Sequence, residues 1–248
     1  MRIHYPTLAS PRRRLAAATA LLLAAAAAAA QPAVAPFSVP DTLAQRVQAC
    51  TTCHGKEGRA TNQGYFPRIA GKPAGYLYNQ LVNFREGRRN YAAMTYLVEH
   101  LSDGYLREIA DHFASLDLPY PPPRPAAATA DVLARGEALA LRGDDARKVP
   151  ACTACHGAAL TGVKPTVPGL LGLPRDYVNS QFGAWSTGQR KAAAPDCMAQ
   201  IAARLGPQDI AAVATWLAAQ PLPADTKPTE SIALPLPLPM PCGSGPKP

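Results

Sequence analysis

The sequence contains few residues that favour β-strands. Its 248 residues include 11 valines and 6 isoleucines, and aromatic residues make up 6% of the chain. Because strands depend on β-branched and aromatic side chains, the composition disfavours a β-sandwich, a β-barrel and a doubly wound α/β fold. Alanine, a strong helix former, is abundant instead. The composition therefore predicts an all-α protein.

Large apolar side chains are also scarce for the length of the chain. The length allows one large domain or two small ones. Two cores of roughly a hundred residues each would need more long aliphatic and aromatic side chains than this sequence contains. We therefore expect something besides side chains to fill part of each core.

Charge is absent from Leu15 to Ala30, and four arginines precede this run: Arg2, Arg12, Arg13 and Arg14. The run is shorter than the roughly 20 residues that a membrane-spanning helix needs. The pattern predicts an export signal over residues 1–30, cleaved after Ala30, and a periplasmic location; an uncleaved N-terminal anchor is the alternative. Basic residues elsewhere form no blocks, so we expect no nucleic-acid partner.

Four of the six cysteines form two C-x-x-C-H motifs. Each motif is followed by glycine, and the two read Cys50-Thr51-Thr52-Cys53-His54 and Cys152-Thr153-Ala154-Cys155-His156. On a helix, positions i, i+3 and i+4 share one face, so both thiols can add to the vinyl groups of one haem while the histidine projects at its iron. The motifs therefore predict two covalently bound haems c. The attachment residues are Cys50, Cys53, Cys152 and Cys155, and the iron ligands are His54 and His156.

Other interpretations of these four cysteines explain less. A zinc ribbon would place its cysteine pairs about 15–20 residues apart, whereas these pairs lie about a hundred residues apart. A thioredoxin-like motif needs a βαβ unit, which the composition disfavours. Two structural disulfides would leave both adjoining histidines unexplained.

The similarity between the two halves continues beyond the motifs. Five residues recur 101 positions later, namely Pro67, Gly71, Tyr76, Gln80 and Gly87, and Met94, Leu101 and Ala110 recur 104 positions later. Such a repeat indicates two units of the same architecture. We assign residues 1–30 to the signal, 36–118 to a first domain, 119–130 to a proline-rich linker, 131–220 to a second domain and 221–248 to a proline-rich tail.

Local signals place the helices of each unit. Ser102 can cap a helix that has Tyr105, Leu106, Ile109, Phe113 and Leu116 on one face. Gly206-Pro207 begins its counterpart in the second unit, with proline in the first turn. The other helices are expected over residues 41–53, 74–86, 131–142 and 174–186.

Methionine is rare, and after residue 30 it occurs only as Met94, Met198 and Met240. The first two occupy equivalent places in the repeat. A thioether suits low-spin haem iron, so Met94 and Met198 are predicted as the second axial ligands, although methionine is also a common core residue. Met240 lies in the tail and is not expected to bind iron. The second unit has no histidine besides His156, and we expect His100 and His112 of the first unit to be solvated or capping.

Several further segments accompany the motifs: Pro67–Lys72, Tyr76–Leu81, Gly87-Arg88-Arg89, Gly143-Asp144, Val149–Cys152 and Met198–Leu217. Together they cover about residues 41 to 220, and the pattern resembles the diheme cytochrome c4 family of periplasmic electron carriers. The resemblance implies two tandem class I cytochrome c domains related by a pseudo-twofold axis, with the haems near the domain interface. It also implies that the carbonyls of Pro67 and Pro168 accept hydrogen bonds from the haem-ligating histidines.

These observations predict a diheme electron carrier, not an enzyme, that transfers electrons between a respiratory donor and a terminal oxidase or another acceptor. One alternative is a diheme redox enzyme, peroxidase-like or thiosulfate-oxidising, and Cys197 is the single feature that favours it. Another is a haem subunit of a membrane oxidase or a periplasmic dehydrogenase, with the proline-rich tail as the docking element.

Cys197 and Cys242 remain after haem attachment. Because an exported chain works in an oxidising compartment, we predict a disulfide between them. A free Cys197 that replaces Met198 as a thiolate ligand and an intermolecular bond through Cys242 are the alternatives. Four basic residues are candidates to pair with haem propionates: Arg88, Arg89, Arg190 and Lys191.

Overall fold

The computed structural model describes residues 42–61, 65–123, 128–231 and 237–245. The expected export signal and its cleavage site lie outside these residues. No helix in the described part of the chain has the length and apolar character needed to cross a membrane.

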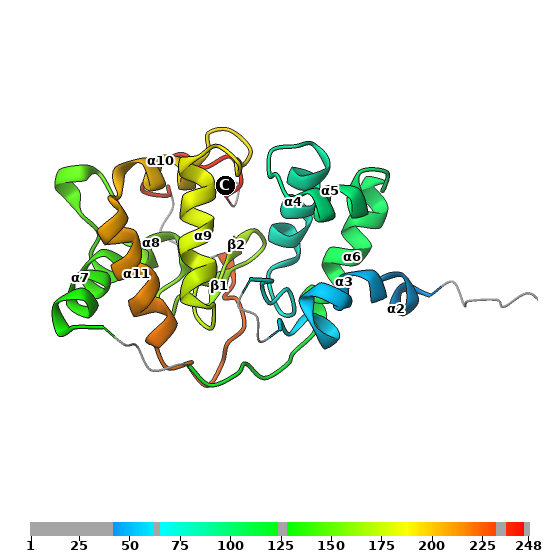
Figure 1. Cartoon of the computed structure of the whole chain (residues 1–248), viewed down its shortest axis with the longest axis horizontal. Helices are drawn as coiled ribbons and strands as arrows, with labels where there is room; N and C mark the ends of the chain where they lie inside the picture. Colours follow the sequence, from blue (N-terminus) through cyan, green and yellow to red (C-terminus); the bar gives the residue numbers. More distant parts are fainter. Residues whose placement is uncertain (1–41, 62–64, 124–127, 232–236, 246–248) are drawn as a thin grey trace, which may run out of the picture. The chain divides into compact units, whose positions relative to one another are not determined.

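The described residues of the first half form five α-helices and a short 3₁₀ turn (Figure 1). They are α2 (Leu43–Arg46), α3 (Gln48–His54), η1 (Lys56–Gly58), α4 (Ala74–Arg85), α5 (Ala92–Val98) and α6 (Asp103–Ser115). The Ser102 hydroxyl accepts from the Tyr105 amide at 3.3 Å, so the expected cap of α6 is present. The apolar face of α6 is buried and packs against α4.

The expected opening helix over residues 41–53 is divided at Val47. Val47 has a ψ of −1°, and the amide of Cys50 bonds to its carbonyl at 3.0 Å, three residues back instead of four. The chain therefore tightens at this residue and restarts as α3. As a result, the first C-x-x-C-H motif lies on a separate short helix.

The second half repeats this arrangement with α7 (Ala130–Leu141), η2 (Asp145–Arg147), α8 (Thr153–His156), α9 (Arg175–Ser186), α10 (Cys197–Arg204) and α11 (Pro207–Ala219). Pro207 occupies the first turn of α11, as the sequence predicts. Within the described residues, regular β-structure is limited to the antiparallel pair β1 (Gly162–Val163) and β2 (Val167–Pro168).

Close packing of α7 against α11 depends on Gly136. A methyl group at this position would lie 2.3 Å from the Ala212 carbonyl oxygen and 2.6 Å from Cβ of Trp216. The two helices can therefore cross in contact only because residue 136 has no side chain.

An ionic network supports the same helices. Asp209 of α11 accepts from Arg135 of α7 at 2.7 Å and from Arg147 of η2 at 2.6 Å. Both arginines also contact Asp144. Hydrogen bonds from Arg135 and then Arg147, with their charges, lower the pKa of Asp209.

Each half has its own apolar core. In the first half the buried side chains include Leu77, Ile109 and Phe113, and in the second they include Leu139, Phe182 and Leu217. Separate cores agree with a tandem repeat of two small units.

The halves meet through equivalent segments, and the contact has twofold character. The Asn90 amide donates to the Gln189 carbonyl at 2.7 Å, and the Lys191 amide donates to the Arg88 carbonyl at 2.6 Å. In the repeat, whose offset is 101 residues, Asn90 corresponds to Lys191 and Arg88 corresponds to Gln189. The two hydrogen bonds are therefore equivalent, with the donor and acceptor halves exchanged. Such reciprocal contact is what a twofold axis between two units produces.

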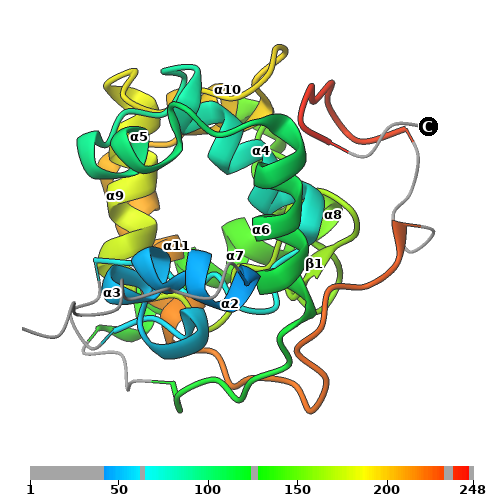
Figure 2. The ribbon, with the colours of Figure 1, turned by 90° about the vertical axis from the view of Figure 1, so that its right-hand side faces the viewer.

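The described parts of the tail return along the second half (Figure 1 and Figure 2). Thr229 pairs with Val163 of β1 in an isolated parallel bridge. Its carbonyl accepts from the Lys164 amide at 2.8 Å, and its amide donates to the Gly162 carbonyl at 2.9 Å. Further on, Met240 is buried. The tail therefore packs against the second unit although its described residues contain no α-helix.

Candidate haem sites and the surface between them

The first site is an apolar cavity of about 380 Å³ in the first half. The short helix α3 contributes Cys50, Cys53 and His54, and α5 contributes Met94. Helix α3 ends directly after the histidine because Gly55 adopts a φ of 76°, and a side chain there would collide with the Ala60 carbonyl. The structure thus brings together the motif and the methionine that the repeat singled out.

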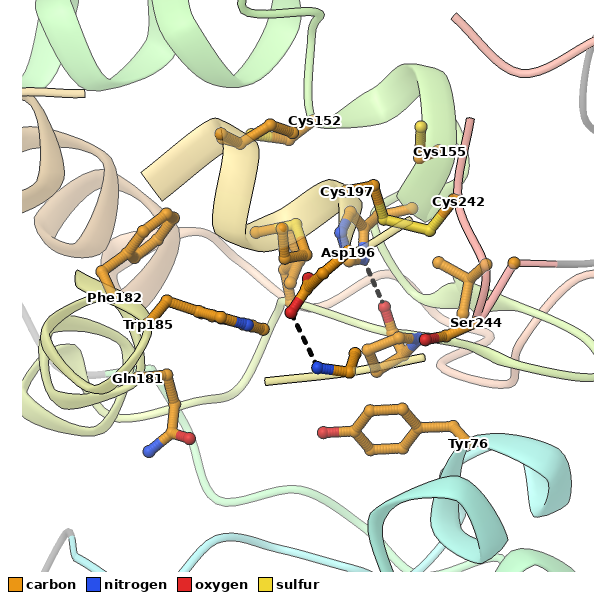
Figure 3. Close-up of a pocket in the computed structure, with 18 of the residues that line it drawn as sticks. Tyr76, Cys152, Cys155, Gln181, Phe182, Trp185, Asp196, Cys197, Cys242 and Ser244 are labelled. Carbon is orange, nitrogen blue, oxygen red and sulfur yellow. Dashed lines mark hydrogen bonds between the residues drawn. A yellow bond between two sulfur atoms is a disulfide. The ribbon is translucent and has the colours of Figure 1, made fainter. Parts of the chain in front are cut away.

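The second site is an apolar cavity of about 180 Å³ in the second half. Its lining includes Cys152, Cys155, His156 and Met198, the counterparts of the first set. Figure 3 shows Cys152 and Cys155 across the cavity from Tyr76, which reaches it from the first half.

Both motif histidines are buried, and each is oriented by a proline carbonyl. His54 Nδ1 lies 2.8 Å from the Pro67 oxygen, and His156 Nδ1 lies 2.7 Å from the Pro168 oxygen. Burial lowers the pKa of both imidazoles, and the carbonyl opposes that change. A neutral ring that donates through Nδ1 keeps the lone pair of Nε2 available, which is the form that binds iron.

The motif thiols are unpaired in the structure. Burial raises the pKa of Cys152 to about 11 and also raises the pKa of Cys50 and Cys155. Among the described residues, no three His, Cys, Asp or Glu side chains are grouped to hold a metal ion directly.

Two buried polar atoms in the second cavity test its fit to a haem. Trp185 Nε1 and Thr166 Oγ1 line this cavity and have no hydrogen-bond partner in the structure. Buried donors are rarely left unpaired, so both indicate a ligand with acceptor groups. An apolar cavity with a C-x-x-C-H motif, a thioether and unpaired donors fits a haem and its propionates.

An arginine pair lies where the two cavities adjoin. Gln80 Oε1 accepts from Arg89 at 3.0 Å and from Arg190 at 3.2 Å, and Gln181 Oε1 accepts from the same two residues at 2.8 and 2.7 Å. Arg190 lines both cavities and Arg89 lines the first. These four residues are two repeat-equivalent pairs, so the arrangement has the twofold character of the backbone contact.

The two guanidinium groups repel each other. Burial, followed by the nearby charge of Arg89, lowers the pKa of Arg190. Within the described residues neither arginine pairs with a carboxylate, and both instead stack on aromatic rings, Arg89 on Phe84 at 4.6 Å and Arg190 on Trp185 at 3.9 Å. Two cations without an acidic partner form a site suited to anions.

The other two basic candidates lie elsewhere. Arg88 pairs with Glu86 and Asn83, and neither Arg88 nor Lys191 lines a cavity. Of the four candidates, Arg89 and Arg190 therefore line the cavities, whereas Arg88 and Lys191 do not. His100 and His112 also line neither cavity.

Cys197 and Cys242 form a disulfide, as the sequence predicts (Figure 3). A thiolate at Cys197 is therefore absent from this structure. The sequence did not reveal how far the tail enters the second cavity, whose lining includes Leu238, Met240, Cys242 and Ser244. The one sequence feature that could have indicated this contact is the alternation of leucine and methionine with proline in the tail, because it supplies apolar side chains to a segment without a helix.

A buried lysine was also missed. Lys72 of the first half donates to the Gly169 carbonyl of the second at 3.2 Å. This bond lies next to Pro168, the residue that orients His156.

Comparison with known proteins agrees with this geometry. No family model matches the chain. It is 38% identical over 75% of its length, and 82% of the relative's length, to a thiosulfate dehydrogenase electron acceptor of Thiomonas intermedia (strain K12). It is 34% identical to a cytochrome c4 of Pseudomonas aeruginosa, over 71% of this chain and 87% of that protein.

Two solved structures are similar as well. Reduced recombinant cytochrome c4 from Pseudomonas stutzeri matches with a TM-score of 0.58 and 28% identity, over 71% of this chain and 95% of that one. Thiosulfate dehydrogenase (TsdBA) from Marichromatium purpuratum matches with a TM-score of 0.60 and 32% identity, over 70% of this chain but 36% of that longer one. The chain therefore belongs to the cytochrome c4 family of all-α diheme electron-transfer proteins with two class I cytochrome c domains, and it carries two covalently bound haems c.

Proposed function

We propose that this protein is a periplasmic carrier that accepts electrons from a thiosulfate dehydrogenase and passes them to a terminal oxidase or another acceptor. One observation carries the proposal: two cavities, each with a C-x-x-C-H motif and a methionine, adjoin at a shared arginine pair. The similarity to a thiosulfate dehydrogenase electron acceptor supports the choice of donor. The chain has no catalytic role of its own in this proposal.

The residues of each cavity have distinct roles. Cys50 and Cys53 in the first half, and Cys152 and Cys155 in the second, hold a haem covalently. His54 and His156 bind iron through Nε2 and are kept in orientation by Pro67 and Pro168. A bound haem c supplies one-electron redox chemistry.

Met94 and Met198 supply the sixth ligand. A thioether closes the iron to exogenous ligands and raises its reduction potential. Met94 lies on α5 in the first half, and Met198 lies on α10 in the second half. Each half therefore supplies the methionine of its own haem.

In this proposal the arginine pair would bind haem propionates, because both guanidinium groups line the cavities. Arg89 and Arg190 offer two cations with no carboxylate partner among the described residues, and Trp185 offers an unpaired donor. Neutralisation of these cations couples haem binding to assembly of the two halves. Arg88 and Lys191 have no part in this role.

The first test combines spectra and kinetics of the purified holoprotein. Two low-spin haems with histidine and methionine ligands are expected in optical and electron paramagnetic resonance spectra. A high-spin or thiolate-ligated haem would instead support a redox enzyme.

The second test uses thiosulfate dehydrogenase in stopped-flow mixing. Thiosulfate together with the dehydrogenase is expected to reduce the protein, whereas thiosulfate alone is not. Reduction by thiosulfate alone would contradict the carrier role, and no reduction in either mixture would contradict the proposed donor.

A further inference from the structure

A lysine of the first half is buried where the two halves meet. Lys72 is 5% exposed, and its ammonium group donates to the Gly169 carbonyl of the second half at 3.2 Å. The ring of Tyr120 lies 5.9 Å from the same nitrogen. Among the described residues, Lys72 pairs with no carboxylate. Since a buried cation without an acidic partner is unfavourable, a nearby group that gains negative charge is expected.

The Lys72 hydrogen bond meets the wall of the second cavity beside its histidine. Gly169 and Pro168 both line this cavity. The Pro168 oxygen lies 2.7 Å from His156 Nδ1. Burial lowers the pKa of His156, the Pro168 carbonyl opposes that change, and the charge of Lys72 lowers the pKa further. Lys72 is therefore coupled electrostatically to the imidazole of the second motif.

The charge of Lys72 is separate from the charges that face the haem propionates. Lys72 lines neither cavity, whereas Arg89 and Arg190 do line them. The arginine pair is thus available to the propionates, and Lys72 is not. In the first half, the charge that acts on the pKa of His54 is that of Arg89. The positive charge of Lys72 therefore remains uncompensated when a haem fills the second cavity, and it acts on that site.

The two halves differ at this position. The repeat offset of 101 residues places Leu173 where the first half has Lys72, and leucine offers neither a charge nor a donor. Arg68, the other buried cation of the same segment, donates to the linker carbonyls of Leu118 and Pro119. The second half therefore has no lysine that reaches the first cavity in the equivalent way.

We propose that Lys72 of the first half raises the reduction potential of the second haem, so that a charge of one half sets the redox property of the other. On reduction, a donor loses one electron, the second haem gains it, and the iron passes from ferric to ferrous. The net charge of the haem becomes one unit more negative, and a fixed cation nearby stabilises that form. The proposal rests on the part of the proposed function that has His156 bind this iron, and it holds for any donor or acceptor.

Burial makes the charge of Lys72 effective. Water and salt screen a buried charge much less than a charge on the surface. In the half-reduced protein, the electron is therefore found on the second haem more often than it would be without Lys72. The contact between the halves thus directs the electron as well as joining the two units.

The experiment removes the charge in two ways in the full-length holoprotein. Lys72→Met removes both the charge and the donor, whereas Lys72→Gln removes the charge and keeps a donor. Lys148→Met is the matched control, because Lys148 is an exposed lysine of the second half. Each protein is titrated with small redox mediators and followed by nuclear magnetic resonance. The haem signals are assigned through contacts with Phe113 in the first cavity and Phe182 in the second.

Both Lys72 variants are expected to lower the potential of the second haem, and the occupancy of the electron on the second haem relative to the first should fall by about tenfold in the half-reduced protein. The first haem should change much less, and Lys148→Met should keep both wild-type potentials. The difference should persist at high salt, because the charge is buried.

Three results would overturn the proposal. They are a wild-type potential of the second haem in both Lys72 variants, an equal shift of both haems, and a wild-type potential in Lys72→Gln alone, which would assign the effect to the hydrogen bond instead of the charge. If Lys72→Met does not fold, Lys72→Gln decides. Because mediators replace the redox partner, a failure of thiosulfate dehydrogenase to reduce the protein would contradict the proposed donor and leave this result in place.

Discussion

Replacement of both Cys197 and Cys242 by serine should destabilise the second half more than the first. The disulfide joins residues 45 positions apart. In the chain-entropy model, closing a loop of this size restricts the unfolded chain by about 4 kcal/mol, an upper figure because engineered and native bonds often contribute less. The start of α10 should survive, because the Asp196 carboxylate accepts from the Ala199 amide at 3.0 Å without help from the disulfide.

The tail also makes contacts that do not involve the disulfide, and one of them provides a control variant. Lys227 pairs with Asp117 at 2.8 Å, but both side chains are largely exposed. Removing this pair with Lys227→Ala should change the free energy of unfolding by less than about 1 kcal/mol. The double serine variant should therefore differ clearly from a variant that merely loosens the tail at its surface.

The assay is urea unfolding of the oxidised holoprotein, followed by circular dichroism and by the absorbance of each haem. The second haem should respond at lower urea in the serine variant, while the first should keep its wild-type midpoint. Separate signals are needed because a two-domain protein with cofactors need not unfold in a single step. A loss no larger than that of Lys227→Ala, or an equal shift for both haems, would refute the reasoning.

Three further predictions concern the ligands and the packing of the helices. Met94→Ala should open one iron per molecule to carbon monoxide and leave the second haem's spectrum unchanged; unaltered carbon monoxide binding would show that Met94 is not the ligand. Gly136→Ala should cost the second half about 1–3 kcal/mol in urea unfolding, because the new methyl group would overlap the Ala212 carbonyl, whereas Gly183→Ala on α9 meets nothing within 4 Å and should be neutral or stabilising. The pKa of Asp209 is lower in the folded than in the unfolded state, so its stabilising effect is complete above the unfolded pKa and is lost as the pH falls through the folded pKa. Acid titration of stability should therefore be flatter in Asp209→Asn, and an unchanged profile would contradict the role of the network.

The sequence by itself determined which residues could carry the chemistry. A C-x-x-C-H motif is readable because haem attachment needs neighbouring positions on one helical turn, and that spacing is local. The repeat then predicted Met94 and Met198 as axial ligands, since the two methionines occupy equivalent positions in its two copies. Helix α6 was equally readable, because a cap and an apolar face are also local signals.

Only the tertiary structure decided how the two halves meet and what each leaves exposed. The pairing of Arg89 with Arg190 depends on a contact between turns a hundred residues apart, and the sequence offered four basic candidates without a means to select two. Counting cysteines predicted the disulfide, but it did not show that the tail would carry Met240 and Leu238 into the second cavity while Tyr96 stays exposed on the first half. The tail alternates proline with leucine and methionine, a pattern that predicts neither a helix nor a paired strand. Its position therefore follows from the surface on which it packs, and the local sequence contains no record of that surface.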